Sequence, residues 1–187
     1  HLSSRRQRQM CIRDSIAAAL TNGSIKINKI GPDRLTTVIQ KLEESGAEIK
    51  SSNNSIDLKM TNEIISPVNI TTGPFPGFPT DMQAQFTVLN AIASGKSFVN
   101  EEVFENRFMH VQELNRMGAD ILTNGSAATI NGVKHLQGAQ VMATDLRASA
   151  CLILAGLVAK GETKVDRIYH IDLSLIHISE PTRRLCI

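Results

Sequence analysis

The stretch FTVLNAIASGKSFV, Phe86–Val99, decides the fold because its two halves follow different periods. The first half is apolar almost all round, which predicts a helix that is buried on all sides. A polar residue and Gly95 follow, at a point where a helix stop needs a left-handed residue. The second half alternates polar and apolar residues and predicts a short strand.

The same pattern occurs twice more in the chain. It is found in IAAALTNGSIKI, Ile16–Ile27, and in CLILAGLVAKGETKV, Cys151–Val165. Gly23 and Gly161 take the place of Gly95, so the three predicted stops are separated by 72 and 66 residues. The chain is therefore predicted to repeat a unit of roughly 70 residues, which is longer than the period of an ordinary solenoid.

A second helix and a hairpin are predicted after the first two strands. Leu35–Lys59 and Phe108–Gly132 both begin with apolar residues at three- and four-residue steps, which predicts a helix with one buried face and one polar face. Both helices end in Gly-Ala, and two short strands follow. The strands are joined by Asn53-Asn54 in one copy and by Asn124-Gly125 in the other, and Asn-Gly favours a tight turn between antiparallel strands.

The predicted fold class is therefore α/β, built from repeated helix–strand–helix–hairpin units. The first helix of each unit should lie inside because it is apolar all round, with the second helices and small sheets around it. The first copy starts in the middle of its helix at Ile16, and the third stops after one strand, at Asp172. We therefore expect an incomplete fold that is cut from a longer protein.

The two ends of the chain do not follow this pattern. The DNA string ATGTGTATAAGAGACAG encodes Met-Cys-Ile-Arg-Asp-Ser, which is Met10–Ser15, and its reverse complement encodes Leu-Ser-Leu-Ile-His-Ile, which is Leu173–Ile178. The string resembles the transposase end-tag used to prepare sequencing libraries. Residues 1–15 and 173–187 are therefore interpreted as translated adapter and left out of the fold prediction, and residues 16–172 as a fragment of one domain.

Composition limits the function classes once these ends are set aside. The 187 residues are 42% hydrophobic and 20% charged, which is ordinary for a globular protein. Six of the 20 basic residues and two of the 18 acidic residues lie in the end segments, so excluding them changes the formal net charge from +2 to −2. No nucleic-acid partner is predicted, because a basic nucleic-acid-binding protein would need these ends to be genuine.

Cysteine content and hydropathy indicate the compartment. No apolar run reaches the length of a membrane span and no signal peptide is visible, so a cytoplasmic protein without a membrane partner is predicted. Cys151 is the one cysteine outside the end segments, and a thiol in an apolar run is more often a small core residue than a nucleophile. It can form no disulfide within residues 16–172, which fits a reducing compartment. No residues have the spacing of metal ligands.

Two aspartates stand at the start of predicted buried helices. Asp81 and Asp145 both follow a threonine, in matching positions 64 residues apart. An aspartate there commonly caps the helix, which contributes about 1 kcal/mol. Capping does not explain Arg147, because the helix dipole opposes a cation in the first turn. Backbone N–H groups and an arginine together suit a phosphate or carboxylate, and an arginine that reaches into solvent is the alternative.

Four runs, PGFPTDMQAQF, VFENRFMHV, GAQVMATDLRASA and VDRIYHID, closely resemble the enolpyruvyl transferases that act on UDP-N-acetylglucosamine. The resemblance covers residues 16–172 and is most specific from Pro74 to Asp172. It implies a two-domain inside-out α/β barrel, in which each domain has three units with buried helices inside and sheets outside. This chain would be part of the C-terminal domain, and the missing first domain of the same parent chain would be its partner.

The resemblance also implies a reaction. Such enzymes transfer the enolpyruvyl group of phosphoenolpyruvate to the 3-hydroxyl of UDP-N-acetylglucosamine by addition and then elimination. They release phosphate and begin peptidoglycan synthesis. Both substrates are small molecules, and the implied reaction needs no metal or organic cofactor.

The resemblance assigns site positions to five residues. Asp81 would bind UDP-N-acetylglucosamine and act as the general base, which requires a carboxylate within hydrogen-bond reach of the hydroxyl. Val103 would contact the nucleotide sugar through its backbone, and a core valine at a strand end is the alternative. Asp145 and Arg147 would lie on the phosphoenolpyruvate side. Arg107 matches a family arginine whose role the sequence does not fix.

The chain departs from the family pattern at three places. The family's acid-donating residue is usually a cysteine on a mobile loop of the other domain, and Cys151 does not match it. The family's lysine near the native N-terminus is absent, and Leu173 stands where the family has an arginine directly after YHID. The 187-residue chain by itself is therefore predicted to lack transferase activity. His110 and His170 stay open between structural and functional roles.

Two other functions stay open. The sister enolpyruvyl transferase, which acts on shikimate 3-phosphate, shares the repeat architecture, but the runs FPTDMQAQF and FENRFMH favour the nucleotide-sugar enzyme. A catalytically dead half-protein that binds a nucleotide sugar or another partner would require the ends of the chain to be genuine.

Overall fold

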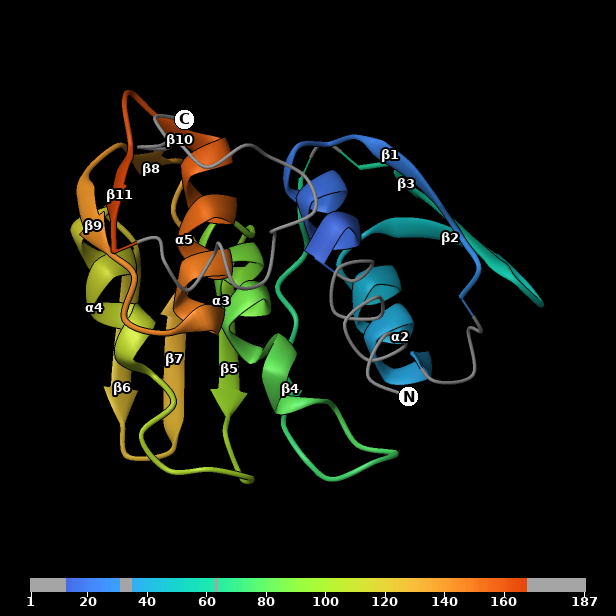
Figure 1. The fold of residues 1–187 in the computed structure, drawn as a ribbon, viewed down its shortest axis with the longest axis horizontal. Helices are drawn as coiled ribbons and strands as arrows, with labels where there is room; N and C mark the ends of the chain where they lie inside the picture. The colour runs from blue at the N-terminus through green and yellow to red at the C-terminus, as the bar shows by residue number, and fades with distance from the viewer. Residues whose placement is uncertain (1–12, 31–34, 63, 168–187) are drawn as a thin grey trace.

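The structure, a computed structural model, describes residues 13–30, 35–62 and 64–167 (Figure 1). Its elements follow the predicted order through two complete units and part of a third. The first unit begins with a helical segment, residues 13–20, so residues 13–15 continue the helix that the sequence predicts from Ile16. The rest of this unit is β1 (Ser24–Asn28), α2 (Thr36–Glu44), β2 (Ala47–Ser52) and β3 (Ser55–Met60).

The second and third units follow without a break in the pattern. The second unit, with the strand that leads into it, is β4 (Ile70–Thr71), the 3-10 turn η2 (Thr80–Met82), α3 (Gln83–Ala91), β5 (Lys96–Asn100), α4 (Met109–Arg116), β6 (Asp120–Asn124) and β7 (Ala127–Asn131). The third part is β8 (Leu136–Gln137), β9 (Gln140–Met142), α5 (Leu146–Val158), β10 (Ala159–Lys160) and β11 (Lys164–Asp166).

The two complete units pair their strands in the same way. β1 pairs antiparallel with β3, which pairs with β2, and β5 pairs antiparallel with β7, which pairs with β6. β4 comes from the segment between the two units and lies parallel to β5. In the third unit β8 lies parallel to β10, and β9 lies parallel to β11, as β4 does to β5. The helix–strand–helix–hairpin repeat is therefore confirmed, and each later unit also has joining strands that the sequence did not predict.

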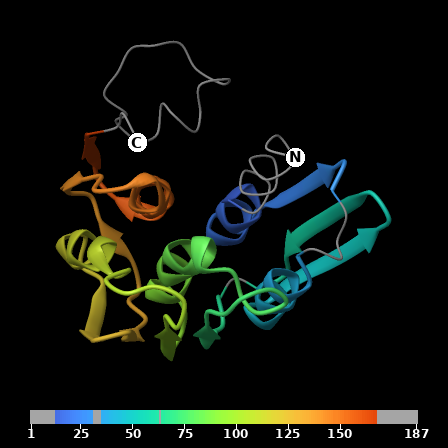
Figure 2. The ribbon, with the colours of Figure 1, turned by 60° about the horizontal axis from the view of Figure 1, so that its bottom comes forward.

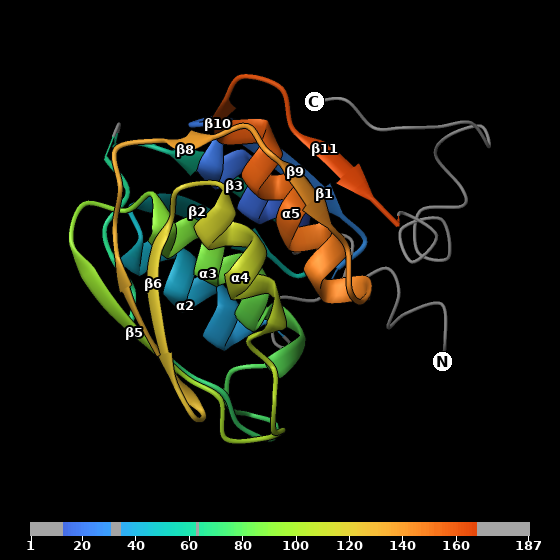
Figure 3. The ribbon, with the colours of Figure 1, turned by 90° about the vertical axis from the view of Figure 1, so that its left-hand side faces the viewer.

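The first helices of the units lie inside. All residues of α3 are buried, and α5 packs against it. Figure 2 shows these two helices and the segment 13–20 grouped in the middle, with the larger sheets around them. α2 and α4 bury one face each, and Figure 3 shows β9 and β11 running beside α5. The predicted fold class, buried helices ringed by small sheets, is confirmed.

Two local predictions need correction. Gly95 and Gly161 have positive φ as predicted, but the first helix reverses at Asn22, with φ 55°, rather than at Gly23. The N–H of Gly23 donates to the carbonyl of Ala18 at 2.8 Å, so the asparagine takes the left-handed position of a Schellman end. The second hairpin turns at residues 125–126 rather than 124–125, because its last strand pair joins residues 124 and 127.

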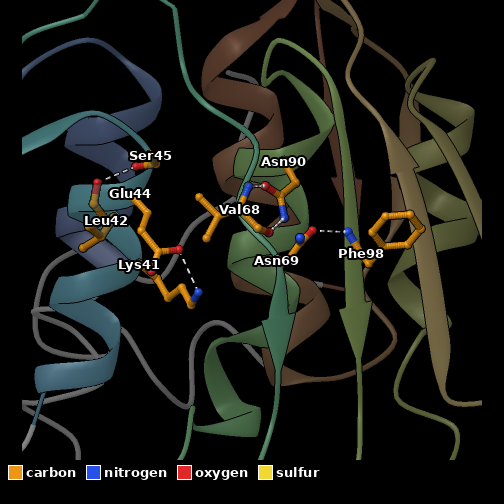
Figure 4. A network of polar contacts seen from close by, with 8 residues as sticks. All are labelled: Lys41, Leu42, Glu44, Ser45, Val68, Asn69, Asn90 and Phe98. Carbon is orange, nitrogen blue, oxygen red and sulfur yellow. Dashed lines mark hydrogen bonds and ion pairs between the residues drawn. The ribbon is translucent and has the colours of Figure 1, made fainter.

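Asn90, in α3, holds the segment that joins the first two units. Its side-chain oxygen accepts from the N–H of Val68 at 2.9 Å, and its amide donates to the Val68 carbonyl at 2.8 Å (Figure 4). Asn90 is fully buried and Val68 is 1% exposed, so this side chain satisfies both backbone groups where water cannot. The next residue, Asn69, accepts from the N–H of Phe98 at 2.9 Å, which ties the same segment to β5.

We expect Asn90→Ala to lower the free energy of unfolding by about 2–4 kcal/mol, because two buried backbone groups of Val68 would lose their partners. Urea unfolding of the purified chain, followed by circular dichroism, measures the change. Asn69→Ala is the matched control, since it removes a single bond at an exposed side chain and should cost about 1 kcal/mol or less. Equal losses in the two variants would contradict the proposed role of Asn90.

Candidate functional site

A cavity of about 280 Å³ lies beside the turn that carries Asp81. The loop between β4 and η2, the turn itself, the start of α2 and Val103 form its wall. The cavity thus brings two of the predicted site residues, Asp81 and Val103, to one place. The ring of Phe75, which is 81% exposed, belongs to the same wall.

Asp81 lies next to Arg147, although the two residues come from successive units. The Nε of Arg147 is 3.5 Å from Oδ1 of Asp81, and the side chains are 31% and 47% exposed. The guanidinium is therefore directed at Asp81 rather than into solvent. Arg13, in the segment interpreted as adapter, is also close: burial lowers its pKa, and the carboxylates of Asp14 and Asp81 act in the opposite direction.

Asp145 caps α5 as predicted. Its Oδ1 accepts from the backbone N–H of Arg147 at 2.7 Å and of Ala148 at 2.9 Å. Its own backbone is extended, with φ −150° and ψ 175°, which is typical of an N-cap. The hydroxyl of Ser149 donates to the Asp145 carbonyl at 2.6 Å. Asp145 therefore binds the backbone N–H of Arg147, while the guanidinium of Arg147 pairs with Asp81.

Asp81 does not cap its helix, and the capping prediction is wrong at this position. The N-cap of η2 is Pro79, whose backbone is extended, and Asp81 lies inside the turn. The proline favours an extended start to the turn, and the hydroxyl of Thr80 donates at 2.7 Å to Glu101. As a result, Asp81 lines the cavity and does not close the helix start.

Glu101 is a site residue that the sequence analysis missed. Its side chain is 2% exposed, and its Oε1 accepts from the N–H of Val103 at 3.1 Å and of Phe104 at 3.2 Å. The hydroxyl of Thr72 donates to the same oxygen at 2.8 Å, and Thr80 donates to Oε2. A buried carboxylate requires donors of this kind. These bonds connect several parts of the cavity wall.

Arg107 lies beside the site and outside the cavity wall. Its Cζ is 4.1 Å from the centre of the Phe104 ring, which is within the range of a cation–π contact. Its Nη1 is buried and has no hydrogen-bond partner among the described residues. The structure therefore brings Arg107 to the loop that carries Val103.

His110 and Cys151 are buried in the core. Burial lowers the pKa of His110 to about 4, although Asp145 and a hydrogen bond with the Arg107 backbone act in the opposite direction, so the imidazole is neutral near pH 7. Burial also raises the pKa of the Cys151 thiol, which therefore stays protonated. The prediction that Cys151 is a core residue is confirmed. His170 lies outside the described residues.

None of the described helices is both long and apolar enough to cross a membrane. Residues 13–30, 35–62 and 64–167 contain no group of three or more His, Cys, Asp and Glu side chains that could hold a metal ion.

The fold is that of the enolpyruvyl transferases. The enolpyruvyl transferase NikO from Streptomyces tendae matches with a TM-score of 0.75, over 94% of this chain and 44% of that chain, at 24% sequence identity. An EPSP synthase from Acinetobacter baumannii matches with a TM-score of 0.63, over 90% of this chain and 39% of that chain, at 19% identity. At these identities the likeness shows the fold.

Sequence comparison places the chain within this class. The profile of EPSP synthase (3-phosphoshikimate 1-carboxyvinyltransferase) matches residues 15–181. The UDP-N-acetylglucosamine 1-carboxyvinyltransferase of Hydrogenovibrio crunogenus (strain DSM 25203 / XCL-2) is 57% identical over 169 residues, which are 90% of this chain and 40% of that protein. The chain therefore belongs to the EPSP synthase family of enolpyruvyl transferases. It spans less than half the length of the relatives that it matches.

Proposed function

We propose that the full-length protein to which this chain belongs transfers the enolpyruvyl group of phosphoenolpyruvate to the 3-hydroxyl of UDP-N-acetylglucosamine. Phosphate is released, and the reaction is the first committed step of peptidoglycan synthesis. The support is 57% identity to a UDP-N-acetylglucosamine 1-carboxyvinyltransferase, against 19% to the EPSP synthase structure. Transfer to shikimate 3-phosphate is therefore the less supported alternative.

The observation that carries the proposal is the position of Asp81, which lines the cavity with Val103 and lies 3.5 Å from Arg147. In the proposed reaction Asp81 accepts the proton of the sugar hydroxyl as the hydroxyl oxygen attacks the carbon of phosphoenolpyruvate that bears the phosphate. The electron pair of the C=C bond takes up a proton at the methylene carbon from the family's acid-donating residue, which the resemblance places in the other domain. Loss of a proton from that carbon and release of phosphate then restore the double bond. The guanidinium of Arg147 pairs with an anionic group of phosphoenolpyruvate, since arginine binds carboxylate and phosphate well. Val103 contacts the sugar through its backbone.

Asp145 and Arg107 have supporting roles in this proposal. Asp145 holds the start of α5, so the guanidinium of Arg147 is presented in a fixed direction. Arg107 is held against Phe104, in the loop that carries Val103, and its contribution there is to support this loop.

We also propose a cytoplasmic location for the full-length protein. The support is the thiol of Cys151, which is free and buried, as suits a reducing compartment.

We further propose that residues 16–172 are the natural part of the chain and that residues 1–15 and 173–187 are translated adapter. Two observations do not coincide with these bounds: the helical segment already begins at residue 13, and the family profile extends to residue 181. Sequencing the parent locus from untagged DNA is therefore the deciding measurement. An arginine codon directly after Asp172 is expected. A genome that encodes LSLIHISEPTRR at this point would contradict the boundary and would favour a half-protein that only binds a nucleotide sugar.

We expect the purified full-length protein to release phosphate from phosphoenolpyruvate when UDP-N-acetylglucosamine is present. The 187-residue chain by itself should show no turnover, because it lacks the family's acid-donating residue and lysine. The assay follows inorganic phosphate, and mass spectrometry identifies the enolpyruvyl product.

Shikimate 3-phosphate, offered in place of the nucleotide sugar, is the control for this assay and should give no product. Turnover with shikimate 3-phosphate but not with the nucleotide sugar would contradict the proposed function. Turnover by the 187-residue chain itself would contradict the prediction that it lacks activity.

A further inference from the structure

Glu101 joins parts of the cavity wall that lie far apart in the sequence. It follows the last residue of β5, and its side chain is 2% exposed behind the wall. It accepts hydrogen bonds from Thr72, directly after β4, from Thr80 in η2, and from the loop after β5. The loops that follow β4 and β5 both lie at the lower edge of Figure 1. A single carboxylate therefore holds three segments together at this edge.

The hydrogen bonds divide between the two oxygens of Glu101. Oε2 accepts from the hydroxyl of Thr80, the residue directly before Asp81, at 2.7 Å. Oε1 accepts from the N–H of Val103 at 3.1 Å, from that of Phe104 at 3.2 Å, and from a threonine hydroxyl at 2.8 Å. Glu101 therefore connects the residue before Asp81 to the backbone of Val103.

We propose that Glu101 is a positioning residue for the nucleotide-sugar side of the site. Its carboxylate fixes the turn of Asp81 relative to the backbone of Val103 and touches neither substrate. A displacement of about 1 Å in a reacting group can cost roughly 100-fold in rate, so bonds that hold both walls have a kinetic effect. This inference rests on the proposed function and deepens it, because it names what sets the geometry of the acceptor side.

Substitutions of Glu101 should form a graded series. Glu101→Ala removes the acceptor of all four donors. Glu101→Gln keeps one acceptor oxygen for the three donors at Oε1 and turns an amide toward Thr80, whose hydroxyl can accept as well as donate. Glutamine should therefore restore most of what alanine loses. Glu102→Ala is the matched control, because the side chain of Glu102 is exposed and outside these bonds.

The kinetic test uses these three variants in the full-length protein. We expect kcat/KM for UDP-N-acetylglucosamine to fall about 100-fold in Glu101→Ala, by roughly tenfold or less in Glu101→Gln, and to stay unchanged in Glu102→Ala. The KM for phosphoenolpyruvate should stay within about twofold of wild type. A purely structural role would reduce the active fraction and leave the KM values of the remaining enzyme unchanged. Wild-type kcat/KM in Glu101→Ala, or a KM for phosphoenolpyruvate that rises as much as the KM for UDP-N-acetylglucosamine, would overturn the proposal.

Thr80→Val covers the case in which Glu101→Ala does not fold, because valine has the volume of threonine and removes one donor. Thr80→Val and Glu101→Gln act on the same contact, so their effects on kcat/KM should not multiply in the double variant. Effects that do multiply would show that Thr80 and Glu101 act separately, which would overturn the proposal.

Hydrogen exchange separates this inference from the proposed function. The N–H groups of Val103 and Phe104 donate to Oε1 of Glu101, so their exchange should accelerate roughly tenfold or more in Glu101→Ala and far less in Glu101→Gln, which keeps an acceptor oxygen for them. Exchange in Glu102→Ala should equal that of wild type. If the wild-type protein shows no transferase activity, the proposed function fails while exchange still decides the role of Glu101. Unchanged exchange at both N–H groups in Glu101→Ala would overturn the positioning role of Glu101.

Discussion

Asp81→Asn in the full-length protein should lower kcat by about 10²–10⁴-fold, the range in which removal of a general base falls. Asparagine keeps the size of the side chain and can hydrogen-bond to a hydroxyl, but it cannot take up the proton. The KM for UDP-N-acetylglucosamine should change far less than kcat, because the binding contact survives. Initial rates measured over a range of both substrates give the two parameters separately.

Two further carboxylate variants serve as controls for Asp81→Asn. Asp120 is exposed on β6, accepts from the amide of Asn131 at 2.9 Å, and lies outside the cavity wall, so Asp120→Asn should have wild-type rates. Asp145→Asn should have a milder effect than Asp81→Asn, because asparagine also caps helices well and Arg147 stays in place. If Asp81→Asn keeps more than about a tenth of wild-type kcat, Asp81 is not the general base.

The repeat could be predicted from the sequence because each unit has its own short-range signals. The helical run of α3, the alternation in β5 and the glycines that end α2 and α4 need no tertiary contact to be recognised, and they occur in the same order twice. β4, β8 and β9 could not be predicted. Each is two or three residues long and exists through pairing with a strand elsewhere in the chain.

Asp81 and Asp145 show where local sequence is insufficient. Both follow a threonine and precede an apolar run, and the same cap is predicted for both. Asp145 does cap α5, whereas Pro79 takes the cap position before Asp81. The hydroxyl of Thr80 meanwhile donates to a residue 21 positions away. A tertiary hydrogen bond therefore competes with the local pattern, and a pattern of a few residues does not contain that information.

Glu101 could have been found from the strand that precedes it. The period of two in β5 buries Ser97 and Val99, and its continuation buries Glu101 and exposes Glu102. Two adjacent glutamates look equivalent by composition, but an acid on the buried face of a predicted strand is unusual and requires partners. The identity of those partners depends on the turn at Thr80 and could come only from the structure.

Gly132→Ala should lower the free energy of unfolding by about 3–5 kcal/mol, which places it among the most damaging single substitutions. An added Cβ would overlap the carbonyl oxygen of Ala93 and lie 3.1 Å from that of Gly95. Both are backbone atoms, so no side-chain rotation relieves the overlap, and the end of β7 must move away from the end of α3. That movement would break the bonds from the N–H groups of Gly132 and Val133 to the carbonyls of Gly95 and Ala91, both 2.8 Å.

Gly73→Ala is the matched control for this prediction. Its added Cβ would lie 3.9 Å from the Cα of Gly77, an ordinary contact, so the free energy of unfolding should change by about 1 kcal/mol or less. Urea unfolding of the purified chain, with m-values compared between variants, measures both changes. A wild-type midpoint for Gly132→Ala would mean that β7 separates from α3 without cost. In that case β7 would not hold α3 in place at this point. The contact between Asp81 and Arg147 would then depend on other packing around α3.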